Sequence, residues 1–384
     1  MSSDLRSWSF TEIVDKLPAR ARAQKVELLA QAQLQAGGSS QPGLKLRVLG
    51  RIADRWLDLG ETERAQKLLR EGSELAKTIP PPGYEIPAFA EALARIDLAA
   101  ALTLIDATRD SAKRGDRVNR VFVFDRSYGE IAYHLARSDP AGAERVLGLI
   151  TSASRRDNYM VAACSRMALA DLSRSQRVAA TIDDPLLRAY AHGAIARALS
   201  ATDKVAAARM LDQAFDDLEK QRDDRQSYSK ASCVAAALLQ AVEQVDRGRL
   251  QESVWRAVAL RAAPVDERGA GWNGRGEAEL ALNIARYDRA AAAAVLAPEV
   301  AAFGTTDVDT HRQAFVAMAL VLIDPLRAVA MVEALPDDPG LDNTLPKNAA
   351  RRMAAEMLAK HGDDRWKEAR VWAVSIWRPV GSDL

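Results

Sequence analysis

The sequence predicts an all-α protein in which about eight to nine antiparallel helical hairpins stack one on the next as an α-solenoid. The main observation is a recurring spacing: an alanine, an aspartate seven residues later, a second alanine four residues after that, then an apolar pair. It fits residues 90–105, 132–147, 196–211, 281–296 and 317–332. The composition agrees, because alanine is abundant, aromatic residues make up 5% of the chain, and no sustained alternation of apolar and polar residues predicts a sheet.

Each copy of this spacing predicts one helical hairpin. The aspartate is expected to end the first helix and to cap the second by accepting hydrogen bonds from its free N–H groups. Proline follows Asp139 and Asp324, where its missing N–H has no intrahelical partner. The alanines let two helices approach closely, and the apolar pair fills the groove between them.

A weaker copy has Ala168, Ser175 and Ala179, and further copies are expected around Asp246 and around residues 362–364. The predicted turns then fall at residues 61, 97, 139, 175, 203, 246, 288, 324 and about 363. One supersecondary unit in every 40 or so residues is the pattern of a solenoid. The interval from 175 to 203 is short and predicts a shortened helix near residues 172–180.

Residues 44–78 form the clearest hairpin, and here the chain resembles a tetratricopeptide repeat. The residues that carry the resemblance are Ala53, Trp56, Gly60, Ala65 and Leu69. Gly72 departs from the family, which usually has alanine there, and later copies lose the turn glycine and most of the aromatic residues. A tetratricopeptide-like protein would be a right-handed stack of antiparallel helix pairs with a concave binding surface.

The segment 1–42 does not fit the spacing, and we expect it to be an N-terminal helical cap. Its first helix is expected to start after Ser9 or Thr11 and its second to run over about residues 20–35. Residues 43–384 are assigned to the solenoid, with subdivisions expected near 220–230 or 264–276. Three tryptophans between residues 366 and 377 suggest an end cap or a contact for a following domain.

Charge and composition restrict the class of function. The net charge of +1 disfavours a nucleic-acid partner, which normally requires a basic excess. Cys164 and Cys233 are expected to be buried free thiols, because two such cysteines support neither a disulfide framework nor a metal site. Neither a signal peptide nor an 18-residue apolar run occurs, so we expect a cytoplasmic protein without a membrane span, unless the chain is a fragment of a longer targeted protein. The composition suggests a bacterial source.

A glycine-rich segment provides the candidate contact residues. Gly269, Gly271 and Gly274 spell G-x-G-x-x-G, but dinucleotide binding requires a strand before the glycines, and here a helix is expected. We therefore predict an inter-repeat loop. The candidate protein-binding residues that it displays are Arg268, Trp272 and Arg275. Tryptophan and arginine are favoured anchors of protein interfaces.

No motif predicts catalysis, a cofactor or a metal. The sequence contains no H-E-x-x-H, phosphate-binding loop or G-x-S-x-G motif, and its carboxylates are explained by capping. His134 and His192 lie in first helices, where packing or capping is a simpler explanation than a metal pair.

The sequence therefore predicts a non-catalytic scaffold that binds a protein or peptide partner on its concave face. The alternative is an α/α-toroid enzyme, glycan- or isoprenoid-processing, with a central pocket. Low aromatic content weighs against that enzyme, because pockets of this kind usually use aromatic platforms.

Overall fold

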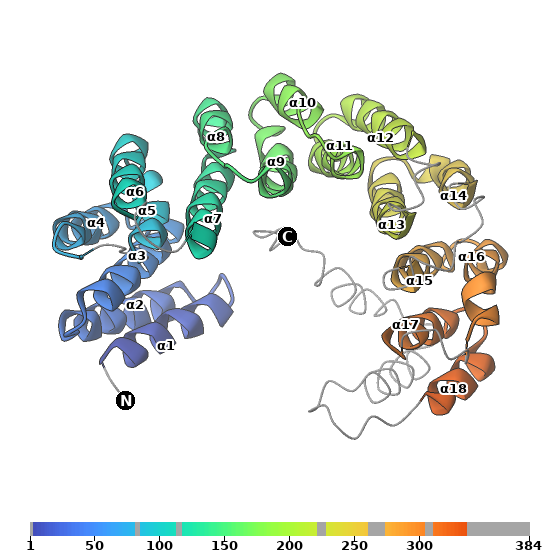
Figure 1. The fold of residues 1–384 in the computed structure, drawn as a ribbon, viewed down its shortest axis with the longest axis horizontal. Helices are drawn as coiled ribbons and strands as arrows, with labels where there is room; N and C mark the ends of the chain where they lie inside the picture. Colours follow the sequence, from blue (N-terminus) through green and yellow to red (C-terminus); the bar gives the residue numbers. More distant parts are fainter. Residues whose placement is uncertain are drawn as a thin grey trace. The chain divides into compact units, whose positions relative to one another are not determined.

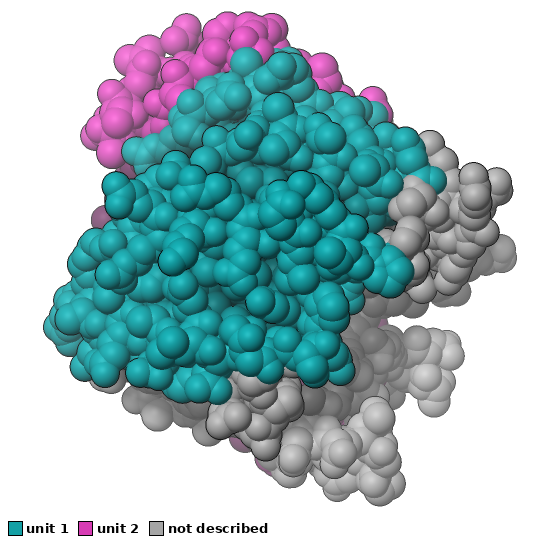
Figure 2. Space-filling view, turned by 90° about the vertical axis from the view of Figure 1, so that its left-hand side faces the viewer, with its two compact units in different colours: residues 1–159 teal, residues 160–384 magenta. Residues whose placement is uncertain are grey.

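The structure, a computed structural model, describes residues 3–80, 85–112, 117–220, 228–259, 273–303 and 310–335. All regular elements within these ranges are helices and none is a strand, which confirms the predicted all-α class. The chain divides into two compact units, residues 1–159 and residues 160–384 (Figure 2). The boundary falls inside helix α9 (Ala153–Met167).

In the first unit, consecutive helices pack as hairpins: α1 with α2, α3 with α4, α5 with α6, and α7 with α8 (Figure 1). The first helices of these hairpins also pack on one another, α1 on α3, α3 on α5 and α5 on α7, and so form a layer within the unit. The bounds are α1 Ser3–Lys16, α2 Arg22–Gly37, α3 Pro42–Asp58, α4 Thr62–Ala76, α5 Glu85–Ala94, α6 Leu98–Ala112, α7 Arg117–Leu135 and α8 Pro140–Leu147.

The second unit repeats this arrangement. Its hairpins pair α11 with α12, α13 with α14, α15 with α16, and α17 with α18, and its first helices pack in the order α11, α13, α15, α17. The bounds are α10 Leu172–Ala180, α11 Pro185–Leu199, α12 Lys204–Glu219, α13 Tyr228–Val245, the 3₁₀ helix η2 Arg247–Arg249, α14 Leu250–Ala259, α15 Asn273–Ile284, α16 Arg289–Ala301, α17 Thr310–Leu320 and α18 Pro325–Ala334.

The turn aspartates act as predicted, and each serves two helices. The aspartate N–H donates to the carbonyl four residues earlier, which closes the first helix, as from Asp139 to Leu135 at 2.8 Å. Its carboxylate then accepts from the N–H three residues later, at 2.9–3.1 Å. Six turns share this second bond, at Asp97, Asp139, Asp171, Asp203, Asp288 and Asp324. Asp246 caps η2 instead.

The expected alanine contacts are present. The two alanines that define the spacing are fully buried in each of the five segments, including Ala132 and Ala143 in the α7–α8 hairpin and Ala281 and Ala292 in the α15–α16 hairpin. The apolar pairs that follow are also buried, at Val146 for example, except that Leu104 is half-buried. Small side chains at these positions bring two helix backbones close, so the groove is filled by the larger pair one turn later.

The register predicted for the weak copy, with its turn at Ser175, is wrong. The cap is Asp171, four residues earlier, so Cys164 and Ser175 occupy the two small positions of this hairpin. Both are fully buried, and the Ser175 hydroxyl donates to the Cys164 carbonyl at 2.8 Å. Because neither residue is alanine, the spacing matched nearby alanines instead. The shortened helix is confirmed, since α10 has nine residues.

The α3–α4 turn reaches the same geometry without an aspartate. Gly60 has a φ of 75° and the Glu61 N–H donates to the Trp56 carbonyl at 2.9 Å, whereas the Glu61 side chain makes no cap bond. A left-handed glycine is the usual alternative way to end a helix. Gly72 has a separate reason, because the Phe89 ring of α5 lies where its Cβ would be, at 2.2 Å.

The N-terminal segment differs from the prediction at its start. Helix α1 begins at Ser3 rather than after Ser9 or Thr11. Both α1 and α2 pack on α3 and belong to the unit of residues 1–159. The turn at 362–364, the three C-terminal tryptophans and most of the segments 220–230 and 264–276 lie outside the described residues. Within the described residues, none of the helices is both long and apolar enough to cross a membrane.

The cap geometry predicts the stability of variants. Replacing Asp139 by alanine should lower the free energy of unfolding by about 1 kcal/mol, because the Gly142 N–H loses its acceptor. Asp139→Asn keeps an acceptor oxygen and should stay close to the parent. Urea unfolding followed by circular dichroism measures both variants, and equal losses in the two would contradict the capping role.

Candidate functional site

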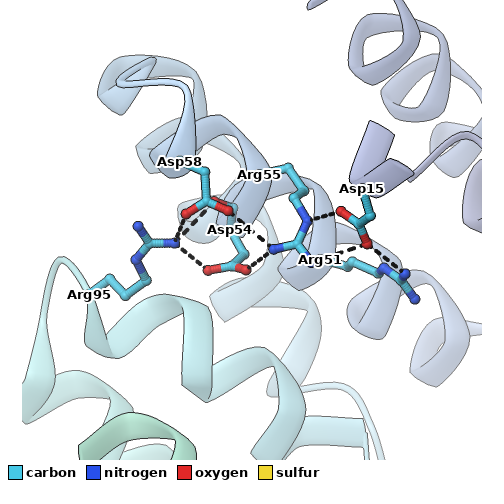
Figure 3. Close-up of polar contacts among 6 residues, drawn as sticks. All are labelled: Asp15, Arg51, Asp54, Arg55, Asp58 and Arg95. Atoms are coloured by element: carbon cyan, nitrogen blue, oxygen red, sulfur yellow. Dashed lines mark hydrogen bonds and ion pairs between the residues drawn. The ribbon is translucent and has the colours of Figure 1, made fainter. Parts of the chain in front are cut away.

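The uncovered side of the first helices in residues 1–159 carries a line of charged side chains, which we call the charged row (Figure 3). Its members are Asp15 of α1, Arg51, Asp54, Arg55 and Asp58 of α3, and Arg95 directly after α5. On α3 these residues lie at intervals of three, one and three, which keeps them on one side of the helix, and the fully buried Ile52, Ala53 and Trp56 occupy the packed side. The row therefore runs over three consecutive first helices.

Every carboxylate of the charged row contacts an arginine. Asp15 accepts from Arg51 at 3.1 Å and also from Arg55. Arg55 in turn donates to Asp54 at 2.7 Å and to Asp58 at 3.2 Å. Arg95 donates to both Asp54 and Asp58 from the next hairpin, at 2.9 Å for Asp58. With three aspartates and three arginines, the row carries no net charge.

The ion pairs of the charged row connect consecutive hairpins, and they add no net charge to the surface. Its side chains are 20–48% exposed, so solvent screens their interactions. Burial would raise the pKa of Asp15, but hydrogen bonds and charge from Arg55 and Arg51 outweigh it and the pKa is lowered. The arginines thus link α1, α3 and the end of α5, and their polar atoms stay partly exposed to solvent.

A second group of residues lies on the same layer of helices, and we call it the acidic cluster. It contains Glu91 of α5, Ser127 and Glu130 of α7, and Tyr159 of α9. The Ser127 hydroxyl donates to Glu91 at 2.6 Å. Burial, together with repulsion from Glu130, raises the pKa of Glu91 to about 8 in spite of that hydrogen bond. Burial also raises the pKa of Glu130.

The acidic cluster differs from the charged row in its ion pairs. Among the described residues, neither Glu91 nor Glu130 forms a salt bridge, and Glu130 accepts no hydrogen bond. Arg126 is exposed and acts on both carboxylates only as a nearby charge. The cluster is therefore a partly buried group of carboxyl side chains whose pKa values are raised, beside a neutral row.

The second unit has a buried charge cluster of its own within the α11–α12 hairpin. Asp217 is 7% exposed, and its carboxylate accepts from Arg188 at 3.3 Å and from Lys220 at 3.2 Å. Nδ1 of His192 lies 3.2 Å from the same carboxylate, without the alignment of a hydrogen bond. Burial lowers the pKa of His192 more than Asp217 raises it. His192 is thus a packed, neutral histidine, as the sequence indicated.

The other candidate residues are placed separately. His134 of α7 is half-buried and its ring meets that of Tyr133 edge-on, with centroids 5.8 Å apart. Cys164 is buried as predicted, whereas Cys233 is half-buried and the prediction of full burial is wrong for it; within the described residues neither forms a disulfide. Within the described ranges, no three histidine, cysteine or acidic side chains are grouped to hold a metal ion.

Most of the predicted contact loop lies outside the described residues. Arg268 and Trp272 lie outside the described residues, and Arg275 falls in the first turn of α15. Sequence reasoning overlooked the charged row, although Arg51, Asp54, Arg55 and Asp58 follow helical spacing and could have indicated a polar stripe. It had no signal for the acidic cluster, because its members come from three separate helices.

Comparison with known proteins leaves the chain without an assigned family. No protein-family model matches it, and no curated protein matches it. Among solved structures, the crystal structure of Ton1535 from Thermococcus onnurineus NA1 aligns with 97% of this chain and 99% of that chain. The two are 14% identical with a TM-score of 0.29, a likeness that carries no argument about fold or function.

The charged row predicts a measurable, salt-sensitive contribution to stability. Arg95→Met should lower the free energy of unfolding by about 1 kcal/mol, because Asp54 and Asp58 lose their contact with the next hairpin. Added salt should reduce the difference from the parent, since exposed charges are screened. Urea titrations at low and high salt measure the effect.

Lys77→Met is the matched control, because Lys77 and its partner Glu74 are 66% and 73% exposed and their pair should contribute nothing measurable. Equal losses for the two variants would contradict a structural role for the row.

The buried histidine predicts a pH dependence. Because burial lowers the pKa of folded His192 below the ordinary histidine value of 6.5, the unfolded chain takes up a proton that folded His192 resists. The free energy of unfolding should therefore fall as the pH drops below about 6.5. In His192→Gln this fall should be smaller, as urea midpoints above and below that pH would show. An unchanged fall would assign the effect to other groups.

Proposed function

We propose that the protein is a non-catalytic scaffold, a right-handed tetratricopeptide-like solenoid that binds a protein or peptide partner on its first-helix face. The observation that carries the proposal is the layer of first helices in each unit. Side chains from successive hairpins reach the same side of that layer, so an extended partner could contact several hairpins at once.

The resemblance to a tetratricopeptide repeat supports the handedness and the concave face. Trp56, Ala53 and Ala65 are fully buried, and Gly60 makes the turn, as that repeat requires. In such a stack the first helices line the concave surface. The aspartate-capped hairpins keep the same small-residue contacts with a different turn, and they extend the architecture along the chain.

The surface chemistry also suits a polar partner. The charged row exposes arginine and aspartate side chains, and arginine is favoured at interfaces because its planar fork makes paired hydrogen bonds. Affinity in such a scaffold would be distributed over many contacts rather than one pocket. Arg268, Trp272 and Arg275 remain candidate contacts of the second unit.

Charge reversal on one face tests the proposal. The purified chain would be the bait in an affinity capture from the lysate of the source organism, with mass spectrometry of what is retained. Arg126→Glu/Arg137→Glu changes two exposed arginines, one in the first helix α7 and one in the turn just after it. The matched control, Lys67→Glu/Arg70→Glu, changes two exposed cations of the second helix α4 by the same charge.

We expect a protein partner that the parent and the control retain and the first-helix variant loses. A partner retained equally by both variants would overturn the placement on this face. Retention of a small molecule and no protein would overturn the scaffold in favour of the toroidal enzyme. Circular dichroism of each variant confirms that it is folded.

A further inference from the structure

We propose that Arg137 binds a carboxylate side chain from an acidic segment of the partner polypeptide, next to the charged row on the layer of first helices. This inference rests on the proposed function, because it names what the first-helix face would recognise. Arginines at the same place in two other hairpins bind carboxylates of the preceding first helix, whereas Arg137 lacks such an acceptor.

The first helices of residues 1–159 share one register, which their fully buried alanines define. These alanines are Ala53 in α3, Ala90 in α5 and Ala132 in α7. The position five residues after the alanine is held by Asp58 at the end of α3, and by Arg95 and Arg137 just after α5 and α7. Because α3 packs on α5 and α5 on α7, these three residues follow one another along the layer as acid, base and base.

An arginine at this position binds carboxylates of the preceding first helix in two described hairpins. Arg95 donates to Asp58 at 2.9 Å and also to Asp54. Arg286 holds the same position just after α15, and it donates to both oxygens of Glu243 of α13, at 3.0 and 3.2 Å. The side chains of Arg95 and Arg286 are only 22% and 13% exposed. The position therefore favours a guanidinium–carboxylate pair.

The helix before Arg137 offers it no carboxylate at the corresponding place. Five residues after the buried alanine of α5 stands Arg95, a second cation, and the residue before it is Ala94. Arg137 is exposed, and among the described residues no salt bridge joins it to a carboxylate. Its guanidinium is therefore available to a group from outside the chain.

Glu91 does not replace the missing acceptor. It lies one residue after the buried alanine of α5, where α3 has Asp54. The Ser127 hydroxyl donates to its carboxylate at 2.6 Å, and burial raises the pKa of Glu91 to about 8. Because this carboxyl is mostly protonated at neutral pH, it leaves the charge of Arg137 unbalanced.

An acidic polypeptide segment is the ligand that this position favours. The equivalent arginines pair with an aspartate in one hairpin and a glutamate in another, so the position accepts either acidic side chain. A guanidinium presents paired N–H donors that match both oxygens of a carboxylate. Because an exposed ion pair contributes little affinity, Arg137 orients an acidic partner that other contacts of the face also hold.

Chemical modification of single arginines tests the inference on the full chain. Phenylglyoxal reacts with guanidinium groups, and mass spectrometry of proteolytic fragments gives a rate for each arginine. Without ligand, we expect Arg137 to react faster than Arg95, whose donors are engaged by Asp54 and Asp58. An amidated peptide of Gly-Glu repeats, at about 1 mM, should slow the reaction of Arg137 about twofold or more, and the same peptide with glutamine should not.

A variant and its matched control locate the site. A fluorescent copy of the Gly-Glu peptide is titrated with each protein, and its polarisation gives the dissociation constant. Arg137→Gln should raise this constant about three- to fivefold, the loss expected for one partly exposed charge pair. Arg145→Gln removes an exposed arginine of the second helix α8 and should match the parent. Thermal melts confirm that both variants are folded.

Several outcomes would overturn the carboxylate site. These are equal protection of Arg137 and Arg145, equal protection by the glutamate and glutamine peptides, or an unchanged dissociation constant for Arg137→Gln. Protection of Arg137 by inorganic phosphate and not by the acidic peptide would overturn it in favour of a phosphate ligand. Failure here, combined with a protein partner that Arg126→Glu/Arg137→Glu loses, would reject the acidic ligand and leave the scaffold standing. Failure of both experiments would reject the scaffold as well.

Discussion

The architecture depends on a pair of hydrogen bonds that a single aspartate makes at each of six turns. Its N–H closes one helix and its carboxylate opens the next, as at Asp203, where the bonds to Leu199 and Ala206 are 2.8 and 2.9 Å long. Because both ends are held by one residue, the path of the chain between two helices is nearly the same in every such hairpin. That constraint determines which residues of the two helices face each other.

Close helix packing follows from this constraint and determines where polar groups lie. With the turn geometry set, the residues seven before and four after the aspartate meet, and only small side chains fit there. Alanine fills most of these positions, while Cys164 and Ser175 fill one pair and add a hydrogen bond of 2.8 Å. Charged residues are excluded from these buried positions, and on the first helices of residues 1–159 they form the charged row and the acidic cluster.

The charged row and the acidic cluster differ in ion pairing, a difference that the net charge of the chain does not reveal. The chain has a net charge of +1, and the charged row is neutral as well. Among the described residues, the acidic cluster keeps two carboxyl groups without an ion pair, and their pKa values are raised. Local differences of this kind allow a surface to discriminate between ligands, because specificity is a difference of affinities.

The sequence by itself determined the helical hairpins, because capping aspartates and close-packed alanines are local signals within about 15 residues of each other. It also indicated the buried Cys164 and His192. Only the tertiary structure decided the register at Asp171, where serine and cysteine replace alanine and the local signal is lost. It alone brought Glu91 to Ser127, 36 residues away, because contacts between successive hairpins depend on how first helices pack and leave no fixed spacing in the chain.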